Sequence, residues 1–240
     1  MINLGSSTRT APNWNSIDFS WIITLGRHKR LTELLHRSGL LSKPRYDRMI
    51  SMDPAVIRWD LRKGIPFADR TFDVVYHSHV LEHVDRDAAP AFLGECLRTL
   101  KEGGVIRIAV PDLELLSRLY LESLARVPNG GSSDEHARAA EAIFDQMIVR
   151  TPKVRREQKP IVRFAEALLI GNTDRAGVLH RWMYDRVSLA ELLRSVGFVD
   201  VQRHTAASSS VTGWASFNLD TNPDGSIYKP DSFYMEARRP

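Results

Sequence analysis

The chain has a single cysteine, Cys96, among its 240 residues. One cysteine excludes an intrachain disulfide and predicts a reducing, cytoplasmic compartment. No run of about 18 apolar residues occurs, so we expect no membrane-spanning helix. The N-terminal sequence MINLGSSTRT also lacks the charged start and the apolar core of a signal peptide.

A large excess of one charge is missing as well. Lys and Arg number 33 against 29 Asp and Glu, which gives a net charge of +4 and a pI near 9.3. The two signs are interspersed, which makes nucleic acid an unfavoured partner, and the small excess suits an acidic or phosphate-bearing molecule. The densest basic run, residues 150–163, is interpreted as a solvated linker rather than a substrate-facing patch.

The chain also lacks the G-x-G-x-x-G sequence that opens a dinucleotide-binding domain. Only Gly5 follows the first predicted strand, residues 2–4, and the next predicted strand begins at residue 15. The link between these strands is too short for the long helix that a dinucleotide needs, so only about a turn of helix fits there.

Strand and helix patterns alternate along the rest of the chain. We expect further strands at 57–59, 72–76, 105–110, 199–204 and 232–237, and helices at 28–40, 44–52, 87–100 and 188–197. Ser188 and Glu191 have the spacing of a capping box. This alternation predicts an α/β fold with a Rossmann-like, doubly wound and mostly parallel sheet, in one domain spanning residues 1–240. A helical insertion or lid is expected at residues 113–175, after the fifth strand.

The segment from Ile57 to Asp112 contains the most specific sequence motifs in the chain. These motifs, IPFADRTFDVV, LEHV and LKEGG, lie around a strand–helix–strand unit. In this order they resemble class I S-adenosylmethionine-dependent methyltransferases, particularly the small ones related to ubiquinone and menaquinone biosynthesis methylases. The resemblance implies S-adenosylmethionine as cofactor and methyl transfer as reaction. The C-terminal part looks more loosely like a bacterial subgroup found with polysaccharide and specialised-metabolite genes, which implies a sugar or another small polar acceptor.

The resemblance also implies a set of cofactor residues. A glycine-rich loop would hold the amino acid part of the cofactor, and here that loop is Gly5, Ser6 and Ser7, with Ser7 where the family usually has a second glycine. Asp18, at the end of the second strand, would accept bonds from the ribose hydroxyls, although it could instead cap the following turn. Asp60 would accept a bond from the adenine amino group, and Leu61 would offer its backbone.

The residues after the fourth predicted strand are candidates for the reacting end. A hydroxyl acceptor must lose a proton, and histidine is the residue type suited to remove it near neutral pH. His79 is the preferred base, and His77 is either a second base or a wall of the cofactor pocket. Glu82 and His83 are interpreted as packing at a helix start. His79, Glu82 and His83 have a spacing that would suit a metal, but no acidic residue precedes them, so no metal is expected.

A second polar group follows the predicted insertion. His180 is a further candidate base, while Arg181, Trp182 and Tyr184 are expected to form a wall of the acceptor site, since mixed aromatic and charged loops often bind substrates. The alternative is an interface loop with a buried Trp182. Asp112, which ends the fifth strand, is expected to border the same space.

Together these observations predict O-methylation of a small polar acceptor, with N-methylation on a small molecule as the next alternative. Two other classes are open: a non-catalytic protein that binds S-adenosylmethionine, which Ser7 would favour, and a nucleic acid methyltransferase, which steep salt dependence would reveal. A homodimer is compatible with the sequence.

Overall fold

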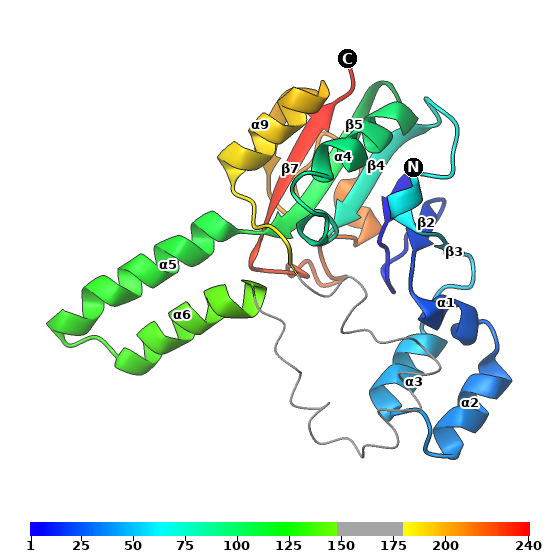
Figure 1. The fold of residues 1–240 in the computed structure, drawn as a ribbon, viewed down its shortest axis with the longest axis horizontal. Helices are drawn as coiled ribbons and strands as arrows, with labels where there is room; N and C mark the ends of the chain where they lie inside the picture. Colours follow the sequence, from blue (N-terminus) through cyan, green and yellow to red (C-terminus); the bar gives the residue numbers. More distant parts are fainter. Residues whose placement is uncertain (148–179) are drawn as a thin grey trace.

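The computed structural model describes residues 1–147 and 180–240. In these residues seven strands form one sheet, in the order β3-β2-β1-β4-β5-β7-β6 (Figure 1). All neighbouring strands are parallel except β7, which runs antiparallel to both β5 and β6. The strands are β1 (Ile2–Leu4), β2 (Asn15–Asp18), β3 (Ile57–Arg58), β4 (Phe72–Ser78), β5 (Leu100–Pro111), β6 (Val199–His204) and β7 (Ser232–Arg238). The predicted Rossmann-like α/β fold is therefore confirmed.

Seven described helices accompany this sheet. They are α1 (Trp21–Gly26), α2 (Lys29–Arg37), α3 (Lys43–Ile50), α4 (Ala89–Thr99), α5 (Leu113–Arg126), α6 (Ser133–Met147) and α9 (Arg186–Val196). Short 3₁₀ turns occur at η1 (Leu61–Lys63), η2 (Leu81–His83), η3 (Val127–Asn129) and η4 (Trp214–Phe217). The link from β1 to β2 is too short for a long helix, as predicted, and the single turn of helix that could fit there does not form.

The main core lies between the sheet and the pair α4 and α9. On α4, Phe92 and Cys96 recur at the four-residue spacing that faces one side of a helix, and both are buried. Leu189 and Leu193 repeat this spacing on α9 and are fully buried in the same cluster. Each such side chain contributes roughly 1.5–3 kcal/mol by leaving water.

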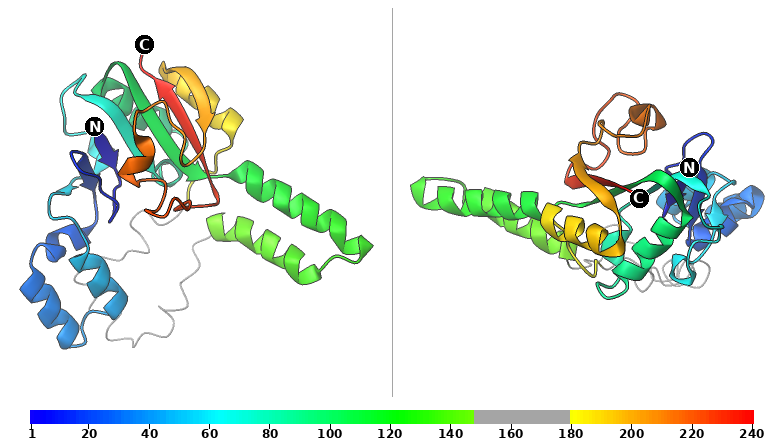
Figure 2. Two further views of the ribbon diagram at one scale, coloured as in Figure 1. Left: turned by 180° about the vertical axis from the view of Figure 1, so that it is seen from behind. Right: turned by 90° about the horizontal axis from the view of Figure 1, so that it is seen from above.

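The other face of the sheet is covered by the C-terminal segment rather than by a helix layer. Figure 2 shows the chain between β6 and β7 on the side opposite α4 and α9. Trp214 from this segment packs on Trp14 and Tyr76. The face beside the short link between β1 and β2 is thus covered by a segment that lies some 200 residues further along the chain, and no local sequence pattern relates the two.

One buried cation anchors that segment. Arg107, in the middle of β5, is fully buried and forms ion pairs with Asp220 at 2.8 Å and Glu236 at 2.7 Å. Its guanidinium also donates to the carbonyl oxygens of Thr205 and Ser208. Because all these partners are in place, a buried charge that would otherwise be costly is satisfied.

Three details differ from the sequence-based expectations. Helix α1 was not expected, and β5 begins at Leu100, so that Gly103 and Gly104 lie inside it. The predicted capping box of Ser188 with Glu191 is wrong. Asp185 is the N-cap of α9, its carboxylate accepts from the backbone N–H groups of Val187 and Ser188, and Ser188 is the residue that bonds back. The cap lies three residues earlier because Asp185, not Ser188, has the extended backbone of a cap.

The predicted insertion begins as a helical hairpin. Helices α5 and α6 pack side by side and project away from the sheet (Figures 1 and 2). Residues 148–175 of the predicted lid lie outside the described residues. Among the described residues, no helix has the length and apolar character needed to cross a membrane.

Candidate functional site

The loop after β1 packs closely against the end of β2 and the loop after β4. Gly5 has a left-handed φ of 71°, and its backbone N–H donates to the carbonyl of Ile17. A Cβ at Gly5 would stand 2.3 Å from Cγ2 of Val80, in the loop after β4. Only glycine therefore fits this position, both for its backbone angle and for its space. Ser6 is buried beside it and makes a second bond to the Ile17 carbonyl.

Ser7 adopts the left-handed backbone conformation that usually favours glycine. Its φ is 48°, and its backbone N–H donates to Oδ2 of Asp18 at 2.9 Å, while its hydroxyl accepts from Arg48. The other carboxylate oxygen of Asp18 accepts from the backbone N–H of Ser20 at 2.8 Å. Asp18 therefore ties the loop after β1 to the start of α1. Each of its oxygens keeps a further lone pair with which a hydroxyl could bond.

Asp60 follows β3, beside the end of β2. It caps η1, and Arg62 forms a two-bonded ion pair with its carboxylate at 2.8 and 2.9 Å. The hydrogen bond from Arg62 lowers the pKa of Asp60, so its carboxylate is charged at neutral pH. Leu61 packs against the main core. These positions put Gly5, Asp18 and Asp60 at the carboxyl ends of three adjacent strands.

His77 faces the core. Its ring is fully buried, Phe92 meets it edge-on at 5.4 Å, and neither ring nitrogen has a hydrogen-bond partner among the described residues. Burial lowers its pKa to about 4, so the ring is neutral at physiological pH. We therefore do not retain His77 as a base, since its nitrogens do not reach the surface where an acceptor would lie.

His79 is differently placed, just beyond β4. It has a left-handed φ of 54°, which is strained for a residue with a side chain. Nδ1 lies 3.2 Å from Oε1 of the buried Glu82, and Nε2 lies 2.7 Å from the hydroxyl of Ser232 on β7. An anionic oxygen near Nδ1 favours the tautomer with its proton there, so that Nε2 accepts from Ser232. Ser232 was missed because no sequence spacing relates it to His79.

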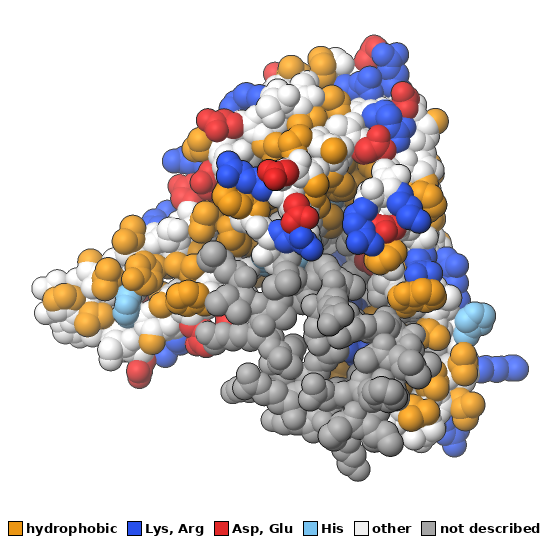
Figure 3. All heavy atoms as spheres, viewed as in Figure 1, with side chains coloured by type: hydrophobic (Ala, Val, Ile, Leu, Met, Phe, Trp, Pro, Cys, Tyr) orange, Lys and Arg blue, Asp and Glu red, His pale blue; other side chains and the backbone are white. Residues whose placement is uncertain are grey.

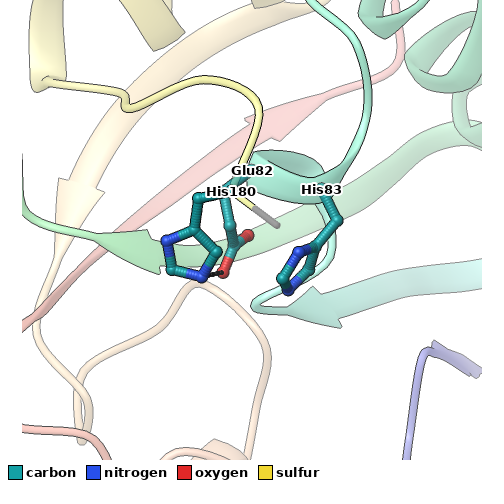
Figure 4. A group of neighbouring side chains, drawn as sticks. All are labelled: Glu82, His83 and His180. Carbon is teal, nitrogen blue, oxygen red and sulfur yellow. Dashed lines mark ion pairs between the residues drawn. The ribbon is translucent and has the colours of Figure 1, made fainter. Parts of the chain in front are cut away.

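Glu82 is the centre of the second group of side chains. Its side chain is fully buried, and no hydrogen bond of good geometry reaches either carboxylate oxygen from the described residues. Burial raises its pKa, but the nearby His79 and His83 more than offset this, and the pKa lies below its ordinary value. His180 Nε2 lies 4.0 Å from Oε1, and burial lowers the pKa of His180. Figure 4 shows Glu82, His83 and His180 gathered together.

The loop that carries His180 is tied to the loop that carries Glu82. The backbone N–H groups of Arg181 and Trp182 both donate to the carbonyl oxygen of Glu82, the first at 2.7 Å. The Arg181 guanidinium pairs with Asp85, and the Arg86 guanidinium lies 4.3 Å from the centre of the Trp182 ring. These contacts bring two segments about a hundred residues apart into one site.

Asp112 and Tyr184 complete this region. Asp112 is the N-cap of α5, bonds Arg203 at 2.9 Å and forms a backbone bridge to Tyr184. The Tyr184 ring is buried, and its hydroxyl has no hydrogen-bond partner among the described residues. Burial and the charge of Glu82 raise its pKa to about 12, so it stays protonated and can donate. Trp182 is 37% exposed, so it is not buried within the chain itself.

The comparisons with known proteins bear on the class. Residues 41–108 match the family model of the methyltransferase domain. No curated protein matches the chain. Similar solved structures include a DhpI complex with S-adenosylhomocysteine (SAH; 14% identity, TM-score 0.46, 99% of this chain and 75% of that one). Another, from Thermotoga maritima, is described as a possible histamine N-methyltransferase (13% identity, TM-score 0.45, 100% of this chain and 81% of that one). A third is a methyltransferase from Bacillus halodurans described as putative (13% identity, TM-score 0.41, 100% of this chain and 91% of that one).

The family match runs from the start of α3 into β5 and includes Asp60 and the loop after β4. Residues 41–108 thus resemble a methyltransferase domain, and the sheet around them has the Rossmann-like arrangement. S-adenosylmethionine fits the residues present, because a glycine that tolerates no side chain and two carboxylates end three adjacent strands. The match leaves out the loop after β1, the α5–α6 hairpin and the His180 loop.

Proposed function

We propose that the chain transfers a methyl group from S-adenosylmethionine to a hydroxyl of a small polar molecule, with His79 as the base. The observation that carries this proposal is the placement of His79 between Glu82 and Ser232. When bound, S-adenosylmethionine supplies an electrophilic methyl carbon. Gly5 and Ser7 would hold its amino acid part, Asp18 its ribose and Asp60 its adenine.

His79 is prepared for proton transfer before an acceptor binds. The anionic carboxylate of Glu82, 3.2 Å from Nδ1, favours a proton on that nitrogen, and Nε2 lies 2.7 Å from the hydroxyl of Ser232. An acceptor hydroxyl that displaces Ser232 would donate to the same lone pair. His79 would then take its proton as the oxygen becomes methylated, which contributes about 10²–10⁴-fold to the rate.

The surroundings of His79 favour a small polar acceptor. Tyr184 offers a buried hydroxyl donor near Glu82, and Arg181 and Trp182 add charged and aromatic surface. Basic and acidic side chains are interspersed on the face seen in Figure 3, which supports a small molecule rather than a nucleic acid. The chain would act as a methyltransferase without a nucleic acid partner.

A screen for methyl transfer tests this proposal. The wild-type chain is incubated with methyl-labelled S-adenosylmethionine and separate panels of sugars, phenols, carboxylates and amines. We expect a hydroxyl acceptor, a loss of at least roughly 100-fold in kcat for His79→Ala, and little change for the exposed His28→Ala control. An amine acceptor whose methylation survives His79→Ala would instead support N-methylation. Binding of S-adenosylmethionine without turnover of any panel would favour the non-catalytic alternative.

A further inference from the structure

The side chains of Glu82, His83 and His180 form a group with the composition of a metal site. One donor atom from each lies within 4.8 Å of the other two, and the His83 and His180 rings are 4.8 Å apart between centroids (Figure 4). The group differs from the one that sequence spacing suggested. His79 is not part of it, because its Nε2 is bonded to Ser232, and the third donor comes from the distant His180 loop.

The buried carboxylate gives an independent reason to expect a cation. Glu82 is fully buried, and neither of its oxygens receives a hydrogen bond of good geometry from the described residues. A buried carboxylate is costly unless it is paired or coordinates a metal. The imidazole of His79 lies 3.2 Å from Oε1 of this carboxylate.

We propose that Glu82, His83 and His180 bind one divalent transition-metal ion of the Zn²⁺ type. Two imidazoles and one carboxylate are a ligand set for such an ion, and they leave a coordination position open for water or a further ligand. Donors around a tetrahedral Zn²⁺ stand about 3.3 Å apart, so the three side chains need to close in by roughly 1–1.5 Å.

The backbone around these residues is already fixed for such a site. The N–H groups of Arg181 and Trp182 bond to the carbonyl oxygen of Glu82, and the Arg181–Asp85 pair adds a second tie. His180 is thereby held next to Glu82 by contacts that do not use the donor atoms.

Metal binding can be measured without any methyl acceptor. The full-length chain is stripped with a chelator and titrated with Zn²⁺ against a competing chelator, and bound metal is counted by mass spectrometry. We expect one ion per chain in the wild type. Glu82→Gln, His83→Ala and His180→Ala should each weaken binding by more than about 100-fold. The exposed His28→Ala should leave one ion bound.

Thermal unfolding provides a second readout for variants whose stability has changed, because each protein is compared with and without Zn²⁺. Excess Zn²⁺ should raise the melting temperature of the wild type and of His28→Ala but not that of Glu82→Gln, measured against each stripped protein. The proposal is overturned if the wild type keeps no Zn²⁺ against the chelator, or if the three variants bind as well as the wild type. Neither readout involves S-adenosylmethionine, so failure here would leave the methyltransferase proposal intact.

Discussion

The backbone N–H of Ser7 donates to Oδ2 of Asp18 at 2.9 Å, which joins the loop after β1 to the end of β2. Because the second carboxylate oxygen holds Ser20, one side chain fixes both segments that would face the cofactor. Asp18 is thus a brace for the loop as well as a candidate ribose ligand.

Asp18→Asn should therefore affect both stability and cofactor binding. One backbone N–H would face an amide nitrogen, which costs roughly 1–3 kcal/mol in the free energy of unfolding, and we expect affinity for S-adenosylmethionine to fall at least about tenfold. Calorimetric titration and denaturant unfolding measure the two effects. Asp53→Asn is the control, since within residues 1–147 and 180–240 the Asp53 side chain accepts a hydrogen bond from the local backbone of Ala55 alone, before β3 begins. Unchanged affinity in Asp18→Asn would show that Asp18 does not shape the cofactor site.

Gly5→Ala should lower the free energy of unfolding by more than the loss of glycine's backbone freedom alone would. Gly39 has a similar φ of 74°, but a Cβ added there would have no atom within 4 Å, whereas a Cβ at Gly5 would meet Val80 at 2.3 Å. Gly39→Ala should cost about 1–2 kcal/mol for its backbone, and Gly5→Ala roughly 1–3 kcal/mol more for the clash. Chemical denaturation of both variants measures the difference. Adding Val80→Ala to Gly5→Ala should restore part of it, and equal costs for the two alanines would contradict the close approach.

His77 should make the fold sensitive to acid. Its pKa is about 4 in the folded chain and near 6.5 ordinarily, so below about pH 6.5 the unfolded chain binds a proton that the folded chain does not. The stability is complete above that pH and falls as the pH drops toward 4, by up to roughly 3 kcal/mol. His77→Leu removes the titrating ring. Its free energy of unfolding should decline less between about pH 7 and pH 4.5 than that of the wild type. Parallel curves would mean that folding does not lower the pKa of His77.

Arg107 should be essential for holding residues 205–231 against the sheet. Arg107→Met would leave Asp220 and Glu236 buried without their cation, at a cost of about 3–5 kcal/mol. Limited proteolysis should then cut within residues 205–231 sooner than in the wild type. Adding Asp220→Asn and Glu236→Gln removes the orphaned charges and should recover part of the loss. A single Arg107→Met variant as stable as the wild type would refute this role.

The sequence predicted the fold well because its strands carry strong local signals. Buried runs such as those of β4 and β5, and the four-residue spacing of Phe92 and Cys96, need no distant partner to be recognised. The capping residue of α9 was misplaced because Asp185 and Ser188 are both favourable caps, and only the backbone angles distinguish them.

The candidate site was less predictable because its contacts join distant segments. Positions at strand ends suggested Gly5, Asp18 and Asp60, and the structure places them at adjacent strand ends. The partners of His79 and Glu82 could not be predicted in this way. Ser232 lies 153 residues from His79 in the sequence, His180 lies about a hundred residues from Glu82, and no local pattern encodes such pairs. The burial of His77 also depends on how α4 packs against β4.

Calorimetric titration of S-adenosylmethionine into the wild-type chain and into Asp60→Asn decides whether this chain binds that cofactor at the ends of β1, β2 and β3. We expect one binding site per chain in the wild type, and affinity at least about tenfold weaker when the Asp60 carboxylate is removed. No detectable binding to the wild-type chain at about millimolar S-adenosylmethionine would contradict it.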